Sequence, residues 1–486
     1  MHHTPSDTVA DTSTQHPAFA PFADCLALQR LAYHANPVPA LQQRLADLDA
    51  LKALVRDNET ALVDAVNADY GSRCRFETRF SEILMVLEDI TRTKKQLKKW
   101  LKPQKRHIDR LLFPTSGCKV LPQPLGVVGV IVPWNFPIML SLSPLVAIFA
   151  AGNRAMVKMS ENSEQLAQLL IKLVPQYFPA DKLQIFADQG GSGAAFSAQP
   201  FDHLFFTGSA QTGRAVMANA AKNLTPVTLE LGGKSPAVVA PDFPLAKAAE
   251  RILWAKAFNA GQICTNVDYL FLPHGSEQPF TELARKLVAQ YYPDINHNDY
   301  TAIIDDRSYN RLQQTLDDAV AKGATAVNLM PGQTPDKALR KFPLTLLFNV
   351  TDDMLVMQRE IFGPLLPVKS YSAAAEVISY INSKPRPLAF YPFTYDKTLQ
   401  QLYLEQVMSG GVTVNHAILH VGQHDLPFGG IGQSGMGHYH GYEGFLTFSK
   451  LRPVFYQGAY NSVSMLLPPY GKFAHKLTDW LIKFKG

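Results

Sequence analysis

The sequence contains little cysteine. Its 486 residues include only four, Cys25, Cys74, Cys118 and Cys264. None belongs to a CxxC pair and their spacing is irregular, which argues against a disulfide framework and against a zinc site. Reduced thiols of this kind are typical of a cytoplasmic protein. An isolated cysteine in such a chain is more often a buried apolar residue than a catalyst.

The chain also lacks a strong net charge and a clean apolar span. Its formal charge is only +5, so we expect no nucleic-acid partner. Residues 125–152 are apolar enough to cross a bilayer, but Pro133, Pro137 and Pro144 interrupt them, which favours a buried strand, turn and helix over a spanning segment. Residues 1–22 are polar and lack the pattern of a signal peptide, which predicts a disordered leader.

What the sequence does contain is strands alternating with helices. Its length exceeds one compact core and predicts about two to four domains. Helically spaced leucines fill residues 41–66, and from residue 125 short apolar strands alternate with helices. A second pattern of the same kind begins near residue 225. This alternation predicts an α/β fold with parallel sheets, whose ligand lies at the carboxyl ends of the strands.

One stretch resembles a phosphate-binding turn. In FFTGSAQTG a strand ends at Gly208 and Ser209, and a helix follows. The N-terminus of a helix offers free N–H groups and a partial positive charge to a phosphate. The spacing differs from GxGxxG, so a structural turn without a ligand fits the stretch equally well.

Two further stretches carry polar side chains in rigid or apolar surroundings. Glu230, in LELGGKS, is a carboxylate among apolar residues, where a raised pKa suits a general base; a capping or ion-paired role is the alternative. We expect the nearby Lys234 to be a structural partner. Asn135, in PWNFP, can donate a hydrogen bond to a developing oxyanion or can satisfy its own turn.

The stretch REIFGPLLP offers a carboxylate beside an aromatic ring. Glu360 can accept two hydrogen bonds from a ribose, and Phe362 can pack against a flat ring. The alternative is an ordinary turn between a helix and a strand.

Five histidines crowd the region from 416 to 440. They are His416, His420, His424, His438 and His440. A spacing of four on a helix would align three of them as metal ligands, but the glycine-rich sequence argues against a helix there. We therefore expect no metal, and we expect these rings to line a pocket or to bond to the backbone.

Together these stretches resemble the aldehyde dehydrogenase superfamily. The matching motifs, in chain order from about residue 30 to about residue 465, are PWNFP, VKMSE, FTGSAQTG, LELGGKSP, GQICT, EIFGP and LPFGGIGQSGMG. Each motif alone is weak, but seven in this order are highly specific. The amino-acid sequence of residues 415–445 is most similar to that of the coniferyl aldehyde dehydrogenases, close to the class-3 and fatty aldehyde branch.

The resemblance implies a role for each matching residue. It makes Cys264 the nucleophile and Glu230 the general base, and it places Asn135 and the backbone N–H of Cys264 in an oxyanion hole. Small polar neighbours would leave the thiolate of Cys264 accessible. The resemblance also implies a set of residues that bind the cofactor: Lys158 and Glu161 at the adenosine ribose, Gly208 and Ser209 at the pyrophosphate, Glu360 at the nicotinamide ribose, and Phe362 beside the nicotinamide.

The resemblance also implies a domain organisation. The implied organisation combines a Rossmann-type cofactor domain, an α/β catalytic domain and a small β element that joins two copies in a homodimer. The expected segments are a leader (1–22), helices of the cofactor domain (23–106), oligomerisation strands (107–120), the dinucleotide-binding domain (121–228), the catalytic domain (229–415), a return to the cofactor domain with an active-site loop (416–449), and an oligomerisation strand with the C-terminal helix (450–486).

The implied chemistry oxidises an aldehyde through a thioester. The thiolate adds to the aldehyde, hydride leaves to the nicotinamide, and water activated by Glu230 releases the acid. A glutamate at 230 favours hydrolysis over transfer to coenzyme A. NAD is favoured because Glu161 would repel a 2′-phosphate, although NADP stays open. The expected substrate is coniferaldehyde or a similar aromatic aldehyde; the alternatives are a fatty aldehyde and a non-catalytic structural relative.

Overall fold

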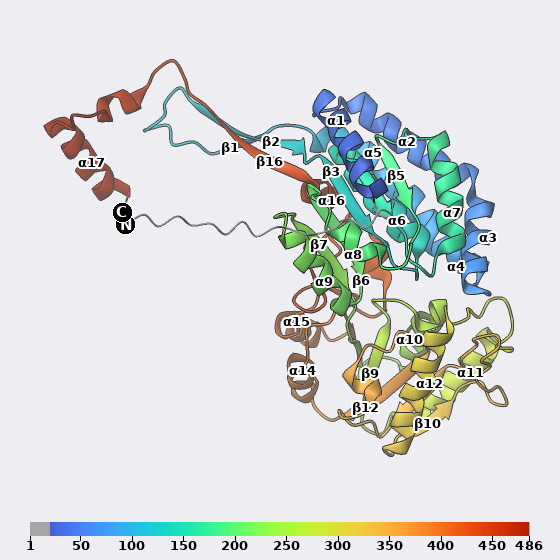
Figure 1. Ribbon diagram of the computed structural model, residues 1–486. Helices are drawn as coiled ribbons and strands as arrows, with labels where there is room; N and C mark the ends of the chain where they lie inside the picture. The colour runs from blue at the N-terminus through green and yellow to red at the C-terminus, as the bar shows by residue number, and fades with distance from the viewer. Residues whose placement is uncertain (1–19, 486) are drawn as a thin grey trace, which may run out of the picture.

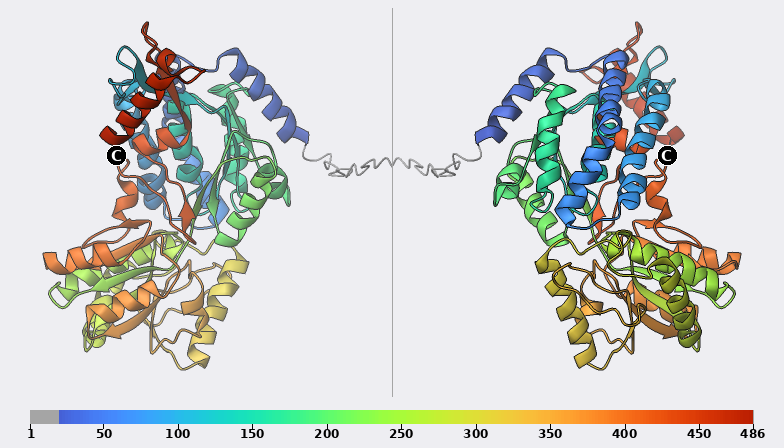
Figure 2. Two further views of the ribbon diagram at one scale, coloured as in Figure 1. Left: turned by 90° about the vertical axis from the view of Figure 1, so that its left-hand side faces the viewer. Right: turned by 90° about the vertical axis from the view of Figure 1, so that its right-hand side faces the viewer.

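The computed structural model describes residues 20–485, in which two α/β lobes are stacked and a narrow arm projects from the upper one (Figure 1). Figure 2 shows the same two lobes from two further sides. Helix α1 (Ala20–Ala35) includes residues 20–22 of the predicted leader. The rest of that prediction, residues 1–19, lies outside the described residues.

The upper lobe is built on a six-stranded sheet in the order β15-β7-β6-β3-β4-β5. All neighbours are parallel except β15 and β7. The chain runs from β3 to β5 on one side and then returns to β6 on the other side of β3. A ligand-binding crevice is expected at such a switch point, at the carboxyl ends of the strands. The strands are β3 (Val127–Ile131), β4 (Arg154–Lys158), β5 (Leu183–Phe186), β6 (His203–Gly208), β7 (Val227–Leu231) and β15 (Gly435–Met436).

Helices cover both faces of this sheet. The apolar region 125–152 forms β3 and then α6, in which every residue except Met139 is buried, as its proline pattern predicted. Among residues 20–485, no helix is both long and apolar enough to cross a membrane. The helices are α2 (Leu41–Asp57), α3 (Glu59–Tyr70), α4 (Arg75–Thr78), the π-helix η2 (Arg79–Ile83), α5 (Leu84–Trp100), α6 (Pro137–Ala151), α7 (Glu164–Leu173), η3 (Val174–Gln176), α8 (Ser192–Ser197), α9 (Ala210–Ala221) and α16 (Gly441–Thr447).

The lower lobe is built on a seven-stranded sheet in the order β10-β11-β12-β9-β8-β13-β14. Only the edge pair β10 and β11 is antiparallel. Its strands are β8 (Ser235–Val239), β9 (Val267–Pro273), β10 (Thr325–Asn328), β11 (Thr345–Phe348), β12 (Leu365–Tyr371), β13 (Ala389–Phe393) and β14 (Gly411–Val412). Its helices are α10 (Leu245–Ala257), η4 (Phe258–Gly261), α11 (Glu277–Tyr291), α12 (Asp306–Ala321), α13 (Leu355–Gln358), α14 (Ala374–Asn382), α15 (Lys397–Gln406) and η5 (Leu419–Gly422).

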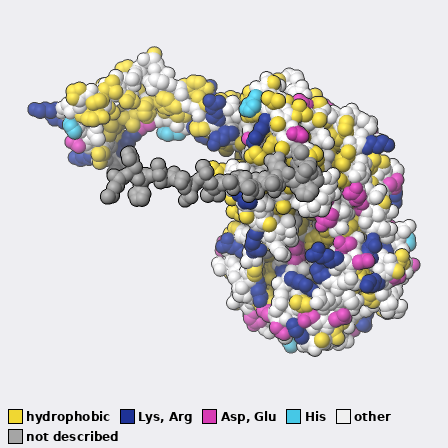
Figure 3. All heavy atoms as spheres, in the orientation of Figure 1, with side chains coloured by type: hydrophobic (Ala, Val, Ile, Leu, Met, Phe, Trp, Pro, Cys, Tyr) yellow, Lys and Arg dark blue, Asp and Glu magenta, His cyan; other side chains and the backbone are white. Residues whose placement is uncertain are grey.

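The arm consists of a three-stranded antiparallel sheet and the C-terminal helix (Figure 1). The sheet order is β1-β2-β16, so among the described residues the long strand β16 has an unpaired outer edge. Apolar side chains are abundant on the arm's surface (Figure 3). The elements are β1 (Gln104–Arg106), β2 (Gly117–Pro124), β16 (Ser449–Tyr456), η6 (Ser462–Leu466) and α17 (Lys472–Lys485).

The predicted fold class is confirmed: two α/β lobes with mostly parallel sheets carry a small β element. The division of the chain at the expected domain boundaries stays a prediction. The first two arm strands cover residues 104–106 and 117–124, so the expected segment 107–120 contains the loop between them and the start of β2.

Candidate active site

The upper sheet brings several of the predicted residues to one edge. Lys158 is the last residue of β4, Gly208 is the last of β6, and Glu230 is the penultimate residue of β7. Asn135 follows β3 by four residues. Because these strands are parallel, their carboxyl ends lie side by side at the crevice that the strand order creates.

Cys264 lies in a tight loop between η4 and β9. Three successive residues, Asn259, Ala260 and Gly261, have positive φ angles of 51°, 50° and 78°. A Cβ atom on Gly261 would lie 2.3 Å from the carbonyl oxygen of Gly363, so only glycine permits this approach. The turn thus holds the Cys264 loop directly against the IFGP segment that follows Glu360.

The thiol of Cys264 is half-buried and strongly perturbed. Burial, followed by the carboxylates of Glu360 and Glu230, raises its pKa to about 12. In this state the sulfur is a neutral thiol at pH 7, which differs from the accessible thiolate that its small neighbours suggested. A cation close to the sulfur would lower this pKa.

Glu230 is a buried carboxyl without a partner among the described residues. It is 3% exposed, and neither side-chain oxygen has a hydrogen bond within residues 20–485. Burial raises the pKa of this carboxyl well above its ordinary value, as its apolar surroundings suggested. Gly435 of β15 pairs with the backbone of Glu230 and closes the edge of the sheet beside it. An unpaired buried carboxyl is costly, and such groups are characteristic of proton-transfer sites.

Asn135 is directed at the Cys264 loop. Its side chain is buried, and Nδ2 donates to the carbonyl of Gln262 at 3.2 Å, two residues before the cysteine. Its own carbonyl accepts hydrogen bonds from Tyr70 and Arg73. The structure thus brings Asn135 and Cys264 together from opposite lobes, with an amide donor close to the sulfur-bearing loop.

Lys158 ends β4, and Glu161 follows it by three residues. Lys158 is 6% exposed and forms an ion pair with Asp188 over 2.5 Å. Glu161 is exposed and accepts a hydrogen bond from Ser160 at 3.1 Å. Sequence reasoning missed Asp188. Its signal was present, because ADQGG follows the strand β5 and therefore ends at the same edge of the sheet.

Gly208 and Ser209 form the predicted strand-to-helix turn. Ser209 is the N-cap of α9, and its hydroxyl accepts from the Thr212 backbone N–H at 3.1 Å. Ser209 also lines a cavity of about 360 Å³ between the lobes, together with Gly232 and Glu360. The exposed start of the helix and a carboxylate therefore share one cavity.

Glu360 lines that cavity and has one unpaired oxygen. Its Oε1 is buried and has no hydrogen bond to any residue that the structure describes, and burial, followed by the charge of Asp268, raises its pKa to about 8. A Cβ on Gly232 would lie 2.1 Å from Glu360 Oε2, so glycine makes room for the carboxylate. Lys234 bonds to Asp268 and to the carbonyls of Val356 and Arg359, which supports the backbone before Glu360.

Phe362 lies on the other side of Glu360. It has a positive φ of 49°, and its ring meets the ring of Trp134 edge-on, with centroids 5.3 Å apart. Trp134 precedes Asn135, so Phe362 connects the IFGP segment to the PWNFP turn.

These features fit a dinucleotide. The start of α9 after Gly208 offers N–H groups for a pyrophosphate, and Glu360 lines the same cavity. Lys158 and Glu161 lie at the end of β4, which β3 separates from β6 in the sheet.

A group of buried and half-buried rings packs near Cys264, and Tyr439 is the member that interacts with it. We call His420, His424, Phe428, Tyr439 and His440 the histidine cluster. Ring centroids are 5.4 Å apart for His424 and His440 and 4.3 Å apart for Tyr439 and His440. Phe428 stacks on His440 at 5.5 Å.

Several polar atoms of the histidine cluster have no hydrogen-bond partner in the described part of the chain. They include Tyr439 Oη, Nδ1 of His440 and Nε2 of His420. After burial, the charges of Glu230 and Cys264 contribute most to raising the pKa of Tyr439, which places its hydroxyl near both residues. Within residues 20–485, no set of three or more His, Cys, Asp or Glu side chains is placed to hold a metal ion.

Comparisons with known proteins agree with this geometry. The aldehyde dehydrogenase family model matches residues 28–454. The chain is 49% identical over 453 residues to the "Probable coniferyl aldehyde dehydrogenase" of Pseudomonas aeruginosa, which covers 93% of this chain and 94% of that protein. It is 44% identical over 454 residues to the "Coniferyl aldehyde dehydrogenase" of a Pseudomonas species, covering 92% and 94%.

A solved structure supports the same assignment. The substrate-bound state of Staphylococcus aureus AldH matches with a TM-score of 0.88 and 31% identity, covering 94% of this chain and 99% of that one. With the family model, these matches confirm the predicted resemblance. The chain belongs to the aldehyde dehydrogenase family and is an NAD(P)-dependent oxidoreductase that acts on aldehydes.

Proposed function

We propose that the chain oxidises coniferaldehyde, or a similar phenolic aromatic aldehyde, to the free carboxylic acid. The relatives named for coniferyl aldehyde support this substrate. The observation that carries the proposal is the histidine cluster near Cys264. Its flat rings suit contact with an aromatic substrate, and its unpaired polar atoms suit ring hydroxyl and methoxy groups. A saturated aliphatic chain would leave those buried polar atoms unsatisfied.

In this proposal Cys264 is the nucleophile. After losing its proton, the sulfur bonds to the aldehyde carbon, and the carbonyl electrons move to oxygen. Asn135 Nδ2 and the backbone N–H of Cys264 donate to that oxygen; such a donor contributes about 10²–10³ in rate. Bound NAD(P)+ supplies the hydride acceptor. Loss of hydride from the former aldehyde carbon leaves a thioester on Cys264.

Glu230 serves as the general base for hydrolysis. Its buried carboxyl takes a proton from water as the water oxygen attacks the thioester carbon. The carbon–sulfur bond then breaks, and the acid leaves. A raised pKa suits this role, because a base is most effective when its pKa lies near the working pH.

We infer that NAD is preferred over NADP, with Lys158, Glu161, Gly208, Ser209, Glu360 and Phe362 holding the cofactor. Asp188 already neutralises Lys158, and Glu161, three residues further along the chain, is an exposed carboxylate. A 2′-phosphate placed there would meet the uncompensated negative charge of Glu161. Comparing kcat/KM for the two cofactors tests this inference: Glu161→Gln should improve NADP relative to NAD, and an unchanged ratio would contradict it.

The decisive experiment follows NADH formation by the purified protein without coenzyme A. Coniferaldehyde and a medium-chain aliphatic aldehyde are compared by kcat/KM. A clear preference for coniferaldehyde is expected. A preference for the aliphatic aldehyde would move the substrate to the fatty branch, and no turnover with either would contradict the proposed chemistry.

We also infer a homodimer formed through the arm. Within residues 20–485 strand β16 has a free edge, and apolar side chains of the arm are open to solvent, among them Phe455, Tyr456, Trp480, Ile482 and Phe484. Such a surface requires a partner, and a second copy can extend the sheet. Light scattering at micromolar concentration should give twice the chain mass of 53.8 kDa; a monomer would contradict the inference.

The unpaired cysteines favour a cytoplasmic location, which cell fractionation tests.

A further inference from the structure

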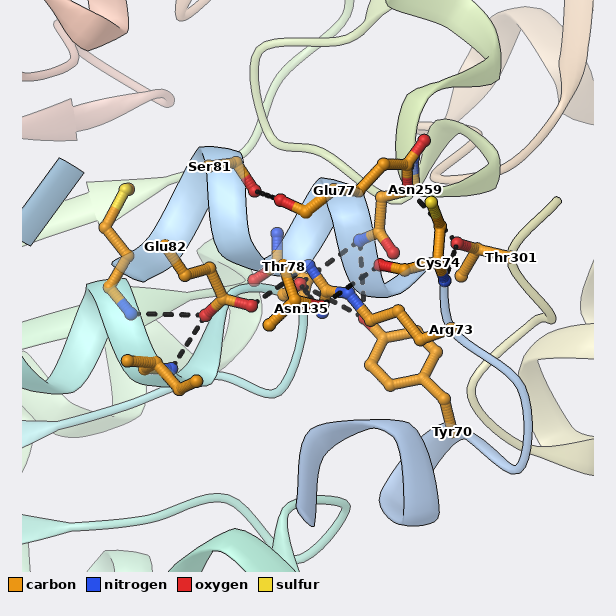
Figure 4. A network of polar contacts seen from close by, with 12 residues as sticks. Tyr70, Arg73, Cys74, Glu77, Thr78, Ser81, Glu82, Asn135, Asn259 and Thr301 are labelled. Atoms are coloured by element: carbon orange, nitrogen blue, oxygen red, sulfur yellow. Dashed lines mark hydrogen bonds and ion pairs between the residues drawn. The ribbon is translucent and has the colours of Figure 1, made fainter. Parts of the chain in front are cut away.

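A buried polar network lies behind the PWNFP turn (Figure 4). Most of its side chains come from residues 70–82, the segment that joins α3 to α5. Figure 4 shows Tyr70 and Arg73 at Asn135 and Glu77 at Asn259, and these two asparagines belong to the two loops of the proposed active site. No motif marks the segment 70–82, and sequence analysis assigned it no role.

Arg73 is the centre of this network. Its side chain is 0% exposed, and its guanidinium carbon lies 4.8 Å from the ring centroid of Tyr70 and 5.0 Å from that of Phe136. Nη1 donates to the main-chain carbonyl of Asn135 at 2.7 Å. Arg73 therefore contacts both Asn135 and the residue that follows it, and two rings fix the plane of its guanidinium group.

Glu82 holds the other side of the same turn. Its Oε1 lies 3.1 Å from Arg73 Nη2, a buried ion pair. Its Oε2 accepts the backbone N–H groups of Ile138 at 2.7 Å and Met139 at 3.2 Å, in the first turn of α6. Glu82 lies in the π-helix η2, a rare local geometry that recurs at functional sites. Arg73 thus holds the turn before Pro137, the first residue of α6, and Glu82 holds it after that residue.

Two further donors complete the site around the Asn135 carbonyl. Tyr70 Oη and Asn259 Nδ2 each lie 3.1 Å from it, so with Arg73 the oxygen accepts three hydrogen bonds in a buried position. With the carbonyl held in this way, the peptide plane is fixed. The main chain from which the Asn135 side chain projects is thereby held, and the amide itself is held by its hydrogen bond to the carbonyl of Gln262.

We propose that Arg73 is a positioning residue for the oxyanion site: it acts through Asn135, by orienting the main chain from which the amide donor projects. The inference rests on the proposed role of Asn135. A donor that shifts by about 1 Å can lose about 10²-fold in rate, so the clamp matters more than its distance from the chemistry suggests. Lysine would be a poor replacement, because a single ammonium cannot span the carbonyl and Glu82 with a planar fork.

A double-mutant cycle tests the inference. Arg73→Met, Asn135→Ala and the double variant are compared by kcat/KM for coniferaldehyde. Asn135→Ala removes only the amide and leaves the carbonyl that Arg73 binds. We expect Arg73→Met to lower kcat/KM by about 10- to 100-fold in the natural chain and by less than about 3-fold in the Asn135→Ala chain. The dissociation constant for NADH, measured by fluorescence, should not change.

Lys182→Met is the matched control. Lys182 is also a buried cation with a carboxylate partner, Asp47, but it lies at the start of β5, away from the carboxyl ends of the strands. We expect both Lys182→Met and Arg73→Met to lower the melting temperature. Lys182→Met should change kcat/KM only slightly, and by the same factor in the natural chain and in the Asn135→Ala chain. Arg73→Lys keeps the charge and serves if Arg73→Met does not fold; its smaller loss should also vanish in the Asn135→Ala chain.

The outcomes separate two failures. If Arg73→Met lowers kcat/KM by the same factor with and without the Asn135 amide, Arg73 acts only through stability and the inference is overturned. If Asn135→Ala by itself leaves kcat/KM unchanged, the proposed oxyanion role fails, and the positioning role falls with it.

Discussion

The carboxylate of Glu77 accepts a hydrogen bond from the backbone N–H of Asn259 at 3.0 Å, across 182 positions of sequence. Both residues are buried, and Glu77 also accepts the hydroxyl of Thr301 at 3.2 Å. Asn259 begins the run of positive φ angles that leads to Cys264. A carboxylate from the upper lobe therefore caps the turn that shapes the cysteine loop of the lower lobe.

Replacing Glu77 should separate hydrogen bonding from charge. Glu77→Ala leaves the Asn259 N–H buried without an acceptor, at a cost of about 1–3 kcal/mol. We expect a lower melting temperature and a reduced kcat/KM. Glu77→Gln keeps an acceptor oxygen and should stay close to the natural protein in both measurements. Equal behaviour of the two variants would show that the turn does not depend on this contact.

Asp89 should make stability depend on pH. It is buried with hydrogen bonds from Ser143 at 2.8 Å and Thr93 at 3.4 Å, and burial raises its pKa from 3.8 to about 7. Between these values the folded chain binds more protons than the unfolded chain. The contribution of Asp89 is therefore complete below pH 3.8 and is lost as pH rises through about 7.

Asp89→Asn removes this titration while it keeps the acceptor for Ser143. Its melting temperature relative to the natural protein should therefore be higher at pH 8 than at pH 5. Differential scanning calorimetry at the two pH values measures the difference. A constant offset would mean that Asp89 does not titrate in this range in the folded protein.

Cys264→Ala should abolish aldehyde oxidation. Without sulfur no thioester forms, so NADH production should fall to background. NADH binding should persist, because the cavity between the lobes is lined by other residues. Fluorescence titration and steady-state kinetics report the two properties separately. Measurable turnover by this variant would remove Cys264 from the mechanism.

Glu230→Gln should stop the reaction after hydride transfer. Gln is close in volume but cannot accept a proton from water, so the thioester should persist. A burst of NADH equal to one per active site, with an acyl adduct in the intact mass spectrum, is the expected result. Turnover close to that of the natural protein, with no adduct, would argue against the base role.

The sequence predicted those parts of the site that are local. A strand, a turn and a helix start are encoded within a few residues, so local pattern alone places Gly208, Ser209 and Glu230 at strand ends. Parallel order then brings strand ends together. The prediction that Asn135 and Cys264 act together needed the family resemblance, because the two residues come from opposite lobes.

The supporting residues could not be found in this way. Arg73 and Glu82 lie in a segment that no motif marks, yet both side chains are fully buried. Their partners are 62 and 56 positions away, at Asn135 and Ile138. Only the tertiary packing of α6 against η2 and α5 makes these contacts, and nothing in local spacing encodes it.

The hydroxyl of Tyr439 in the histidine cluster should affect substrate choice. Tyr439 Oη is buried and has no partner within residues 20–485, so Tyr439→Phe should cost little stability in the free enzyme. If the hydroxyl binds a polar ring substituent, the variant should lose about 10-fold in kcat/KM for coniferaldehyde. Cinnamaldehyde lacks those substituents and should be affected far less.

Tyr391→Phe is the control for this comparison, because the Tyr391 hydroxyl is already occupied by the carbonyl of Thr265. Its loss acts on the backbone next to Cys264 and should reduce turnover of both aldehydes by the same factor. The ratio of the two kcat/KM values therefore isolates recognition from damage. A ratio that Tyr439→Phe leaves unchanged would mean that the hydroxyl does not face the ring substituents, and the proposed aromatic preference would then rest on ring contacts alone.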